Sequence, residues 1–279
     1  MYIDAHNHLQ DAWLQPHLDQ LAGHLVTLGL SAAVVNGTCE GDWDAVTTLA
    51  RRFPWVRPSY GVHPWDAGNR TPAWLDHLRS RLLADPQAAV GEIGIDRWMT
   101  DSARPDDARL SGLRRAPLSE QSEVFLTQLA LATELDRPAT VHCLQAWGAL
   151  DELLRGSPRP ARGFLLHAYS GPKEMVPGFA QLGAYFSFNG AFLDPRKEAI
   201  REAFLAVPSE RLLVETDAPA MLPPPMWRTH KLPPTPEGTG VNHPGNIEAA
   251  YAGLAALRGL SVKELAAQVA ANFTRLFGE

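Results

Sequence analysis

The sequence is poor in cysteine and has no long hydrophobic run. Its two cysteines, Cys39 and Cys143, form neither the spacing of a metal site nor a disulfide framework, which fits a reducing compartment. No apolar run approaches the roughly 18 residues of a membrane span. Strand-like sequence begins at residue 2, which leaves no room for a signal peptide. We therefore expect a cytoplasmic protein that does not interact with membranes.

Positive charge is also scarce. The formal net charge is −6, so no global basic surface is available to attract duplex nucleic acid or anionic lipid. The 45% hydrophobic and 20% charged residues are ordinary for a globular protein. A chain of 279 residues fits one α/β barrel, and we expect a single domain spanning residues 1–279. Nothing in the sequence points to an obligatory protein partner.

Eight short apolar runs alternate with segments of helical periodicity. This alternation predicts parallel βαβ units, and hence either a closed (β/α)8 TIM barrel or an open doubly wound sheet. No glycine-rich dinucleotide fingerprint follows the first run, which argues against the open sheet. The predicted strands are residues 2–8, 32–37, 56–61, 88–96, 138–142, 163–167, 184–188 and 211–215.

Two segments interrupt the alternation. Residues 97–118, after the fourth strand, are rich in arginine and aspartate, and we interpret them as a long surface loop over one mouth of the fold. The helix that follows is predicted to begin at Ser119 as its N-cap. Residues 218–245, after the eighth strand, are proline-rich. They could bind a proline-recognising module, but their position favours the rim of an active site.

The first strand runs into two histidines, His6 and His8, whose side chains point the same way because residues of a strand alternate faces. Four more potential ligands each stand at the C-terminal end of a separate apolar run: Glu92, His142, His167 and Asp217. In a barrel, these strand ends meet at one face. Taken alone, His142 or His167 would be better explained as a buried core histidine, whereas the recurrence predicts a metal centre and favours the barrel.

Four histidines and two carboxylates suit zinc, manganese, iron or magnesium better than metals that prefer thiolates. Six ligands exceed the needs of one tetrahedral ion with an open position, but they suffice for two ions if a carboxylate bridges them. Two ions about 3.5–4 Å apart can activate a bound hydroxide as nucleophile and hold the displaced oxygen. The pattern therefore predicts hydrolysis of an ester, an amide or a phosphodiester.

Several motifs together resemble one known family. The chain is similar to the TatD-like deoxyribonucleases of the amidohydrolase superfamily, and the similarity runs from end to end. The matching segments are Asp4 to His8, Gly61 to Pro64, Gly91 to Asp96, the helix around Gln121 to Leu131, His142, His167 with Ser170 and Gly171, Glu215 to Pro219, and Asn272 to Gly278.

The resemblance assigns roles to the six residues. It implies that His6 and His8 bind one ion, that His142 and His167 bind a second, and that Glu92 bridges them. Asp217 would complete the site and take the proton from the attacking water, so Asp217 and Glu92 are the predicted catalytic residues. The implied ions are two divalent metals, zinc, magnesium or manganese.

The substrate contacts depart from the family pattern. The family usually has an arginine two residues after the strand-five histidine, where this chain has Leu144, and often a histidine where this chain has Trp65. Its asparagine-glutamate-proline motif appears here as residues 242–244, Asn-His-Pro. We assign Cys143 to packing, facing away from His142.

The predicted activity is a deoxyribonuclease or phosphodiesterase acting on DNA ends or single-stranded DNA. The predicted substrate-binding residues are His63, Trp65, Arg97, Trp98 and Lys231. The alternatives are an esterase or amidase acting on a small ester or phosphate compound, and a non-catalytic barrel that keeps metal for stability.

Overall fold

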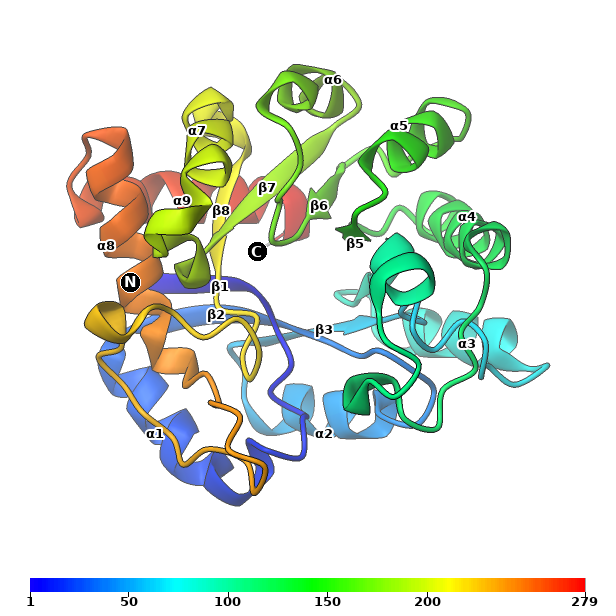
Figure 1. Cartoon of the computed structure of the whole chain (residues 1–279), viewed down its shortest axis with the longest axis horizontal. Helices are drawn as coiled ribbons and strands as arrows, with labels where there is room; N and C mark the ends of the chain where they lie inside the picture. The colour runs from blue at the N-terminus through cyan, green and yellow to red at the C-terminus, as the bar shows by residue number, and fades with distance from the viewer. Residues whose placement is uncertain (279) are drawn as a thin grey trace.

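A computed structural model describes residues 1–278 and contains one sheet of eight strands in chain order. Every strand pairs in parallel with the next, from β1 to β8. Figure 1 shows the strands curving around a common centre with the helices outside. The (β/α)8 barrel predicted from the sequence is confirmed. The strands are β1 (Tyr2–Asn7), β2 (Leu30–Asn36), β3 (Val56–Tyr60), β4 (Ala89–Asp96), β5 (Ala139–Leu144), β6 (Phe164–Leu166), β7 (Ala184–Asn189) and β8 (Leu212–Glu215).

The helices follow the strands and bury their apolar faces against the outside of the barrel. The first of them ends at Gly29, whose φ of 87° suits glycine at a helix C-terminus. No helix among residues 1–278 combines the length and the apolar character that crossing a bilayer requires. The helices are α1 (Leu18–Leu28), α2 (Trp43–Arg52), α3 (Trp74–Ala84), α4 (Leu118–Glu134), α5 (Trp147–Arg155), α6 (Val176–Gln181), α7 (Glu198–Ala206), α8 (Ile247–Arg258) and α9 (Val262–Phe277).

The first and last strands meet through buried polar contacts. The carboxylate of Asp4 accepts hydrogen bonds from the backbone N–H of Thr216 at 3.0 Å and from its hydroxyl at 2.6 Å. One residue further on, the N–H of Asp217 donates to the carbonyl of His6 at 2.9 Å. Since Asp4 is only 2% exposed, these bonds form away from water and hold β1 beside β8.

The fourth and fifth strands approach each other closely at Gly94. Its φ is +148°, and a Cβ at this position would lie 2.0 Å from the carbonyl oxygen of His142. Only glycine fits such an approach. Every residue of β4 is buried, as expected for a parallel strand covered on both faces. Because Gly94 has no side chain, β4, which carries Glu92, can lie close to β5, which carries His142.

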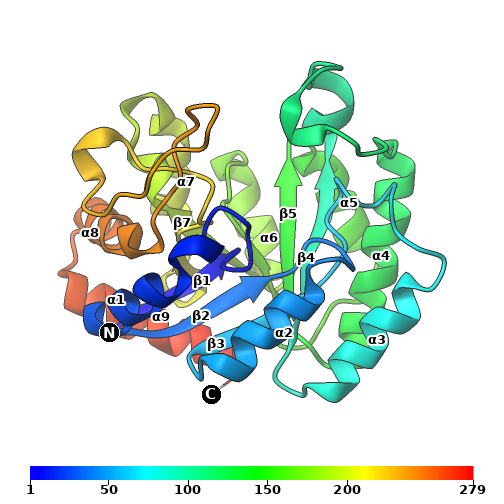
Figure 2. The same ribbon diagram turned by 90° about the horizontal axis from the view of Figure 1, so that it is seen from below.

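Residues 97–118 are more ordered than their composition predicted. They contain a π-helical turn, Trp98–Ser102, and a 3-10 turn, Ala108–Leu110, with the side chains of Met99 and Leu110 buried. Arg115 donates hydrogen bonds to four carbonyl groups within the segment, at 2.6 to 3.4 Å. Figure 2 shows that this segment and the loop after β8 rise at the same end of the barrel.

Helix α4 starts without a side-chain cap, so the prediction of Ser119 as N-cap was wrong. Pro117 occupies the cap position with φ −63° and ψ 158°, and Ser119 already lies inside the first turn. The helix is instead anchored by two buried glutamines. Gln121 pairs with the N–H and C=O of Asp96, and Gln128 pairs with the N–H and C=O of Val62. Asp96 ends β4 and Val62 follows β3, so both glutamines attach α4 to the end of the barrel that carries the candidate site.

The variant Gln128→Leu is expected to lower the free energy of unfolding. Leucine keeps the bulk of the side chain but leaves the buried N–H and C=O of Val62 without partners, which costs about 1–3 kcal/mol for each unpaired group. Chemical denaturation measures the change. The control is Thr127→Ala on the exposed face of the same helix, where the hydroxyl only bonds to the carbonyl of Glu123. Equal stability of the two variants would contradict the anchoring role.

Candidate metal centre

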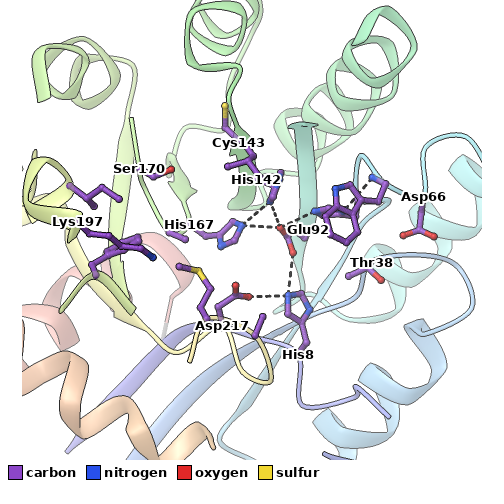
Figure 3. A pocket seen from close by; sticks show the side chains of 18 residues that line it. His8, Thr38, Asp66, Glu92, His142, Cys143, His167, Ser170, Lys197 and Asp217 are labelled. Carbon is purple, nitrogen blue, oxygen red and sulfur yellow. Dashed lines mark hydrogen bonds and ion pairs between the residues drawn. The ribbon is translucent and has the colours of Figure 1, made fainter. Parts of the chain in front are cut away.

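The six predicted ligands converge at the C-terminal end of the barrel, beside a cavity of about 520 Å³. Five of them line this catalytic cavity, and Figure 3 shows them turned toward its centre. His6 lies beneath them, fully buried, with its ring stacked on that of His167 at 3.9 Å between centroids. The positions are His6 on β1, His8 just after it, Glu92 on β4, His142 on β5, His167 after β6 and Asp217 after β8.

The two carboxylate oxygens of Glu92 face different histidine pairs. Oε2 lies 3.4 Å from Nε2 of His6 and 3.3 Å from Nε2 of His8. Oε1 lies 3.0 Å from Nδ1 of His142 and 2.8 Å from Nε2 of His167. The carboxylate therefore stands between two sets of nitrogen donors, as a bridging ligand would.

Asp217 completes the His6 and His8 side of the centre. Its Oδ1 lies 3.5 Å from Nε2 of His6 and 3.3 Å from Nε2 of His8. The backbone φ of Asp217 is +53°, in the left-handed region that residues other than glycine seldom adopt. Such a conformation costs on the order of 1–3 kcal/mol and persists where the surroundings impose it. Here the bond from its N–H to the carbonyl of His6 helps to hold it.

The spacing of the ring nitrogens suits divalent ions. His6 Nε2 and His8 Nε2 are 3.2 Å apart, as are His142 Nδ1 and His167 Nε2. Two nitrogens bound to one tetrahedral zinc at about 2.0–2.1 Å lie roughly 3.4 Å apart. The opposite nitrogens of His8 and His142 are held by the carbonyl of Asn36 at 2.8 Å and the carboxylate of Asp96 at 3.2 Å. Such support for the far nitrogen is typical of metal-bound histidines.

The charges of these groups shift one another's pKa values. Burial lowers the pKa of His142, but the carboxylates of Asp96 and Glu92 outweigh it and raise the pKa to about 9, so a metal that binds His142 must displace its proton. Burial alone would raise the pKa of Asp217, whereas His6 and His8 hold it well below the usual range of a carboxyl. The pKa of Glu92 is lowered in the same way by its histidine neighbours. Both acids are therefore carboxylates, the form that binds metal.

Two of the predicted substrate-binding residues border the catalytic cavity. His63 lines it and places Nε2 3.3 Å from Oε1 of Glu92. Trp65 lines it as well, and its indole N–H donates to Asp96 at 2.6 Å. That hydrogen bond fixes the face that Trp65 presents at the rim of the cavity.

The other three do not line the catalytic cavity. Arg97 is exposed, with its guanidinium 4.0 Å from Asp101. Trp98 packs under the guanidinium of Arg109, 4.3 Å from the ring centroid. Lys231 is exposed on the loop after β8. Substrate contact by Arg97, Trp98 and Lys231 stays a prediction.

Sequence reasoning overlooked two residues of this site. Asp96 supports both His142 and Trp65, and it follows Glu92 by four residues, a spacing that places both on one face of a strand. Lys197, which precedes α7, lines the catalytic cavity, although no spacing in the sequence singles it out. Cys143 is buried in the hydrophobic core, in keeping with its assignment to packing, and it also borders the cavity.

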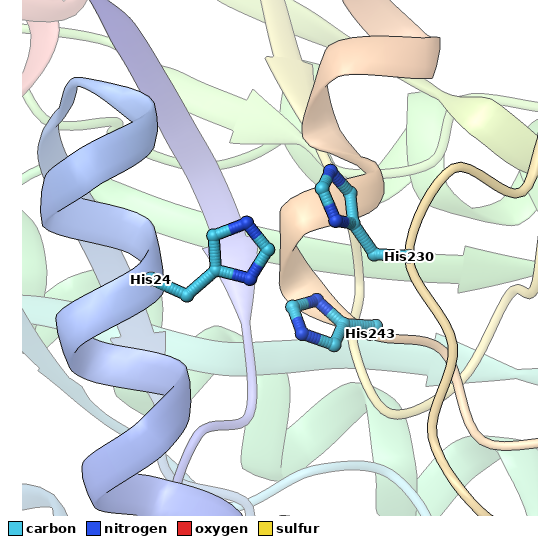
Figure 4. A group of neighbouring side chains, drawn as sticks. All are labelled: His24, His230 and His243. Carbon is cyan, nitrogen blue, oxygen red and sulfur yellow. The ribbon is translucent and has the colours of Figure 1, made fainter.

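A second histidine cluster lies outside this centre, between α1 and the loop after β8 (Figure 4). The rings of His24 and His230 are 4.5 Å apart, and each lies 5.2 Å from the ring of His243. His243 Nδ1 accepts the N–H of Gly245 at 2.8 Å, and His230 Nε2 lies 2.9 Å from Glu248. The three rings pack against one another, so the cluster joins the loop after β8 to α1.

Comparison with known proteins agrees with this geometry. The model of the TatD-related DNases matches residues 3–278. The chain belongs to this family. As a TatD-family protein it is 30% identical over 262 residues to the 3′-5′ ssDNA/RNA exonuclease TatD of Klebsiella pneumoniae (strain 342), covering 93% of this chain and 91% of that one.

Solved structures of TatD-family proteins share the fold. The YjjV TatD homologue of Escherichia coli K12 superimposes with a TM-score of 0.84 at 25% identity, over 100% of this chain and 98% of that one. A TatD-family hydrolase of Entamoeba histolytica gives a TM-score of 0.81 at 18% identity, again over 100% and 98% of the two chains. Both likenesses span the whole barrel and the segments that rise around the site.

Loading the protein with zinc or manganese is expected to raise its melting temperature above that of chelator-treated protein. A ligand at about a hundred times its dissociation constant adds about 2.7 kcal/mol, or roughly 5 °C or more for a chain of this size. Replacing His6 and His8 together by alanine should reduce the shift, whereas replacing the exposed His77 should not. Differential scanning calorimetry measures the shift, and equal shifts in all three proteins would contradict the assignment.

Proposed function

We propose that the protein is a phosphodiesterase that removes nucleotides from an end of single-stranded DNA, with the whole chain acting as one catalytic domain. The observation that carries this proposal is the carboxylate of Glu92, whose two oxygens face two separate pairs of histidines. The name of the Klebsiella relative, a 3′-5′ ssDNA/RNA exonuclease, supports the choice of a polynucleotide substrate and of the 3′ end.

Two divalent ions, zinc, magnesium or manganese, would be held by these residues. His6, His8 and Asp217 would bind the first ion, His142 and His167 the second, and Glu92 both. Ions bound there would polarise the scissile phosphate and lower the pKa of a water molecule. These residues suit the proposal because the ring nitrogens within each histidine pair lie 3.2 Å apart. Glu92 and Asp217 are both ionised, as ligands of a cation must be.

Asp217 is the proposed proton acceptor. Its carboxylate borders the cavity and touches His6 and His8, so a water beside it lies within reach of both the base and the substrate. Asp217 takes the proton of that water as its oxygen attacks phosphorus. The ester bond from phosphorus to the departing nucleotide oxygen breaks, and that oxygen takes up a proton from Asp217 or from solvent. Glu92 is buried deeper, 3% exposed, and serves to hold the centre rather than to transfer a proton.

The shape and charge of the cavity restrict the DNA form. The catalytic cavity is lined by residues that follow several strands, and the chain carries a net charge of −6. A duplex offers two charged backbones and a rigid width, whereas a single strand can place one phosphate among the ligands and one base against Trp65. Stacking of an unpaired base on an aromatic ring contributes about 1–3 kcal/mol.

A specific observation favours a second candidate, hydrolysis of a small ester. The cavity wall beside the ligands is apolar at Leu144, Phe192, Ile200 and Met221. Leu144 occupies the position where the resemblance leads one to expect an arginine. An esterase or amidase would use the same ligands and base with a neutral apolar substrate in place of a nucleotide.

A substrate comparison separates the candidates. Protein loaded with zinc, manganese or magnesium is offered single-stranded DNA labelled at either end, duplex DNA, and chromogenic phosphodiester, carboxyl-ester and amide compounds. We expect stepwise shortening of single strands from the 3′ end and slow action on blunt duplex. Turnover of the carboxyl ester or amide without any cut DNA would replace the nuclease proposal by the small-ester hydrolase. No turnover of any compound would leave the non-catalytic barrel.

The bridging role of Glu92 makes a prediction about stoichiometry. Metal-reconstituted wild-type protein should approach two equivalents by elemental analysis after gel filtration. Glu92→Gln removes the shared negative charge while keeping the shape, so its metal content should fall to one equivalent or less. Glu40→Gln, a partly buried acid that does not line the catalytic cavity, is the control. A wild-type ceiling at one equivalent would contradict the bridge.

Asp217→Asn should lower the turnover number while leaving the fold intact. The amide keeps the shape but cannot accept the proton, and loss of a general base typically costs about 10²–10⁴ in rate. Initial rates on single-stranded DNA and metal content are measured on the same samples. Asp66→Asn is the control, because the carboxylate of Asp66 lines the same cavity but forms no ion pair with a histidine among residues 1–278. A variant with near wild-type turnover would exclude Asp217 as the base.

A further inference from the structure

A second cavity of about 660 Å³ adjoins the catalytic cavity. It lies between the segment that follows β7 and the proline-rich loop that follows β8. Lys197 belongs to the lining of both cavities. Its side chain therefore stands at the passage between the ligands and this second cavity, which we call the outer cavity.

Lys197 is the single lysine or arginine in the lining of the catalytic cavity, within residues 1–278. Its side chain is half-buried and lies with Nζ 5.4 Å from the ring centroid of Phe192. Asp194 acts on it only at a distance, without an ion pair, and burial lowers the pKa of its ammonium group. A partly desolvated cation without a bound counter-ion attracts an anionic ligand.

The position of Lys197 is fixed by the segment that carries it. Arg201 of α7 donates hydrogen bonds to the carbonyl oxygens of Phe192 at 2.8 Å and Pro195 at 3.2 Å. Phe192 in turn packs edge-on against Phe188 of β7, 5.7 Å between centroids. The segment before α7 is therefore a rigid support, which favours a preformed site over an adjustable surface lysine.

The outer cavity continues the positive charge away from the ligands. Its lining contains Arg196, Lys197 and Arg228 against one acid, Asp194. Arg196 pairs with that acid, while Arg228 uses its Nε to bond to the carbonyl of Pro223 and forms no ion pair among the described residues. Two cations thus remain without a carboxylate partner along a path that starts at the catalytic cavity.

We propose that the outer cavity is a subsite for the phosphodiester backbone of the nucleotides next to the cleaved one, with Lys197 binding the phosphate at the passage and Arg228 the following one. The inference rests on the proposed function, because it needs a polynucleotide in the catalytic cavity. It places the cation that compensates for Leu144 on the β7 side of the barrel, opposite Thr38 and Asp66 in Figure 3.

The test compares a short and a long substrate of the metal-loaded full chain. The short one is thymidine 5′-(4-nitrophenyl phosphate), which fills only the catalytic cavity. The long one is an oligothymidylate that spans both cavities. For wild-type protein we expect the Michaelis constant to fall as the oligothymidylate lengthens beyond the catalytic cavity.

Arg228→Met should raise the Michaelis constant for the oligothymidylate roughly tenfold, the value of one charge-assisted phosphate contact, and leave the short ester unchanged. Lys197→Met should raise it by a similar factor and reduce the slope of log affinity against log salt by about 0.7. Lys263→Met, an exposed lysine on α9, is the matched control for loss of one charge.

The outcomes separate the two proposals. If wild-type protein cuts no oligothymidylate with zinc, manganese or magnesium, the proposed function fails. If it cuts the oligothymidylate but Lys197→Met and Arg228→Met behave like Lys263→Met, only the subsite is overturned. Equal losses of Arg228→Met on the short and long substrates also overturn it, because Arg228 lines the outer cavity and not the catalytic cavity. Lys197 lines both cavities, so its variant is judged on the long substrate and the salt slope. Circular dichroism of each variant excludes misfolding as the cause.

Discussion

A single buried carboxylate organises the functional end of this barrel. Glu92 is 3% exposed and is surrounded by the imidazoles of His6, His8, His142 and His167. An isolated ionised carboxylate in such a place would cost several kcal/mol in lost hydration. The nitrogen donors offset that cost, and these four come from three other strands, with His63 after β3 as a further neighbour. The buried charge of Glu92 on β4 is therefore stabilised only because β1, β5 and β6 end beside it and bring their histidines within reach.

Supporting contacts extend this arrangement outward. Asp96, four residues after Glu92, holds both His142 and the indole of Trp65. Gln121 of α4 binds the backbone of Asp96 and so connects the helix layer to the ligand layer. The rigidity of the centre therefore comes from buried polar pairs as well as from apolar packing.

The substrate side of the barrel is built differently from the metal side. An apolar wall with one half-buried lysine faces the ligands, and the remaining positive charge lies in the outer cavity. The net charge of −6 disfavours nonspecific binding of DNA to the protein surface, while the cations of the outer cavity can still bind the backbone of one strand. Family membership accounts for the residues predicted as ligands, whereas the outer cavity is formed by the segments after β7 and β8.

The sequence by itself determined the barrel and the meeting of the predicted ligands, because strand alternation and the placing of Glu92, His142, His167 and Asp217 at strand ends are local patterns with one geometric consequence. It failed where the outcome depends on contacts between distant segments. Order within residues 97–118 comes from Arg115 and buried Met99, and the role of Lys197 comes from two loops that meet only after folding. Composition and spacing describe neighbours along the chain, whereas burial and charge pairing belong to neighbours in space.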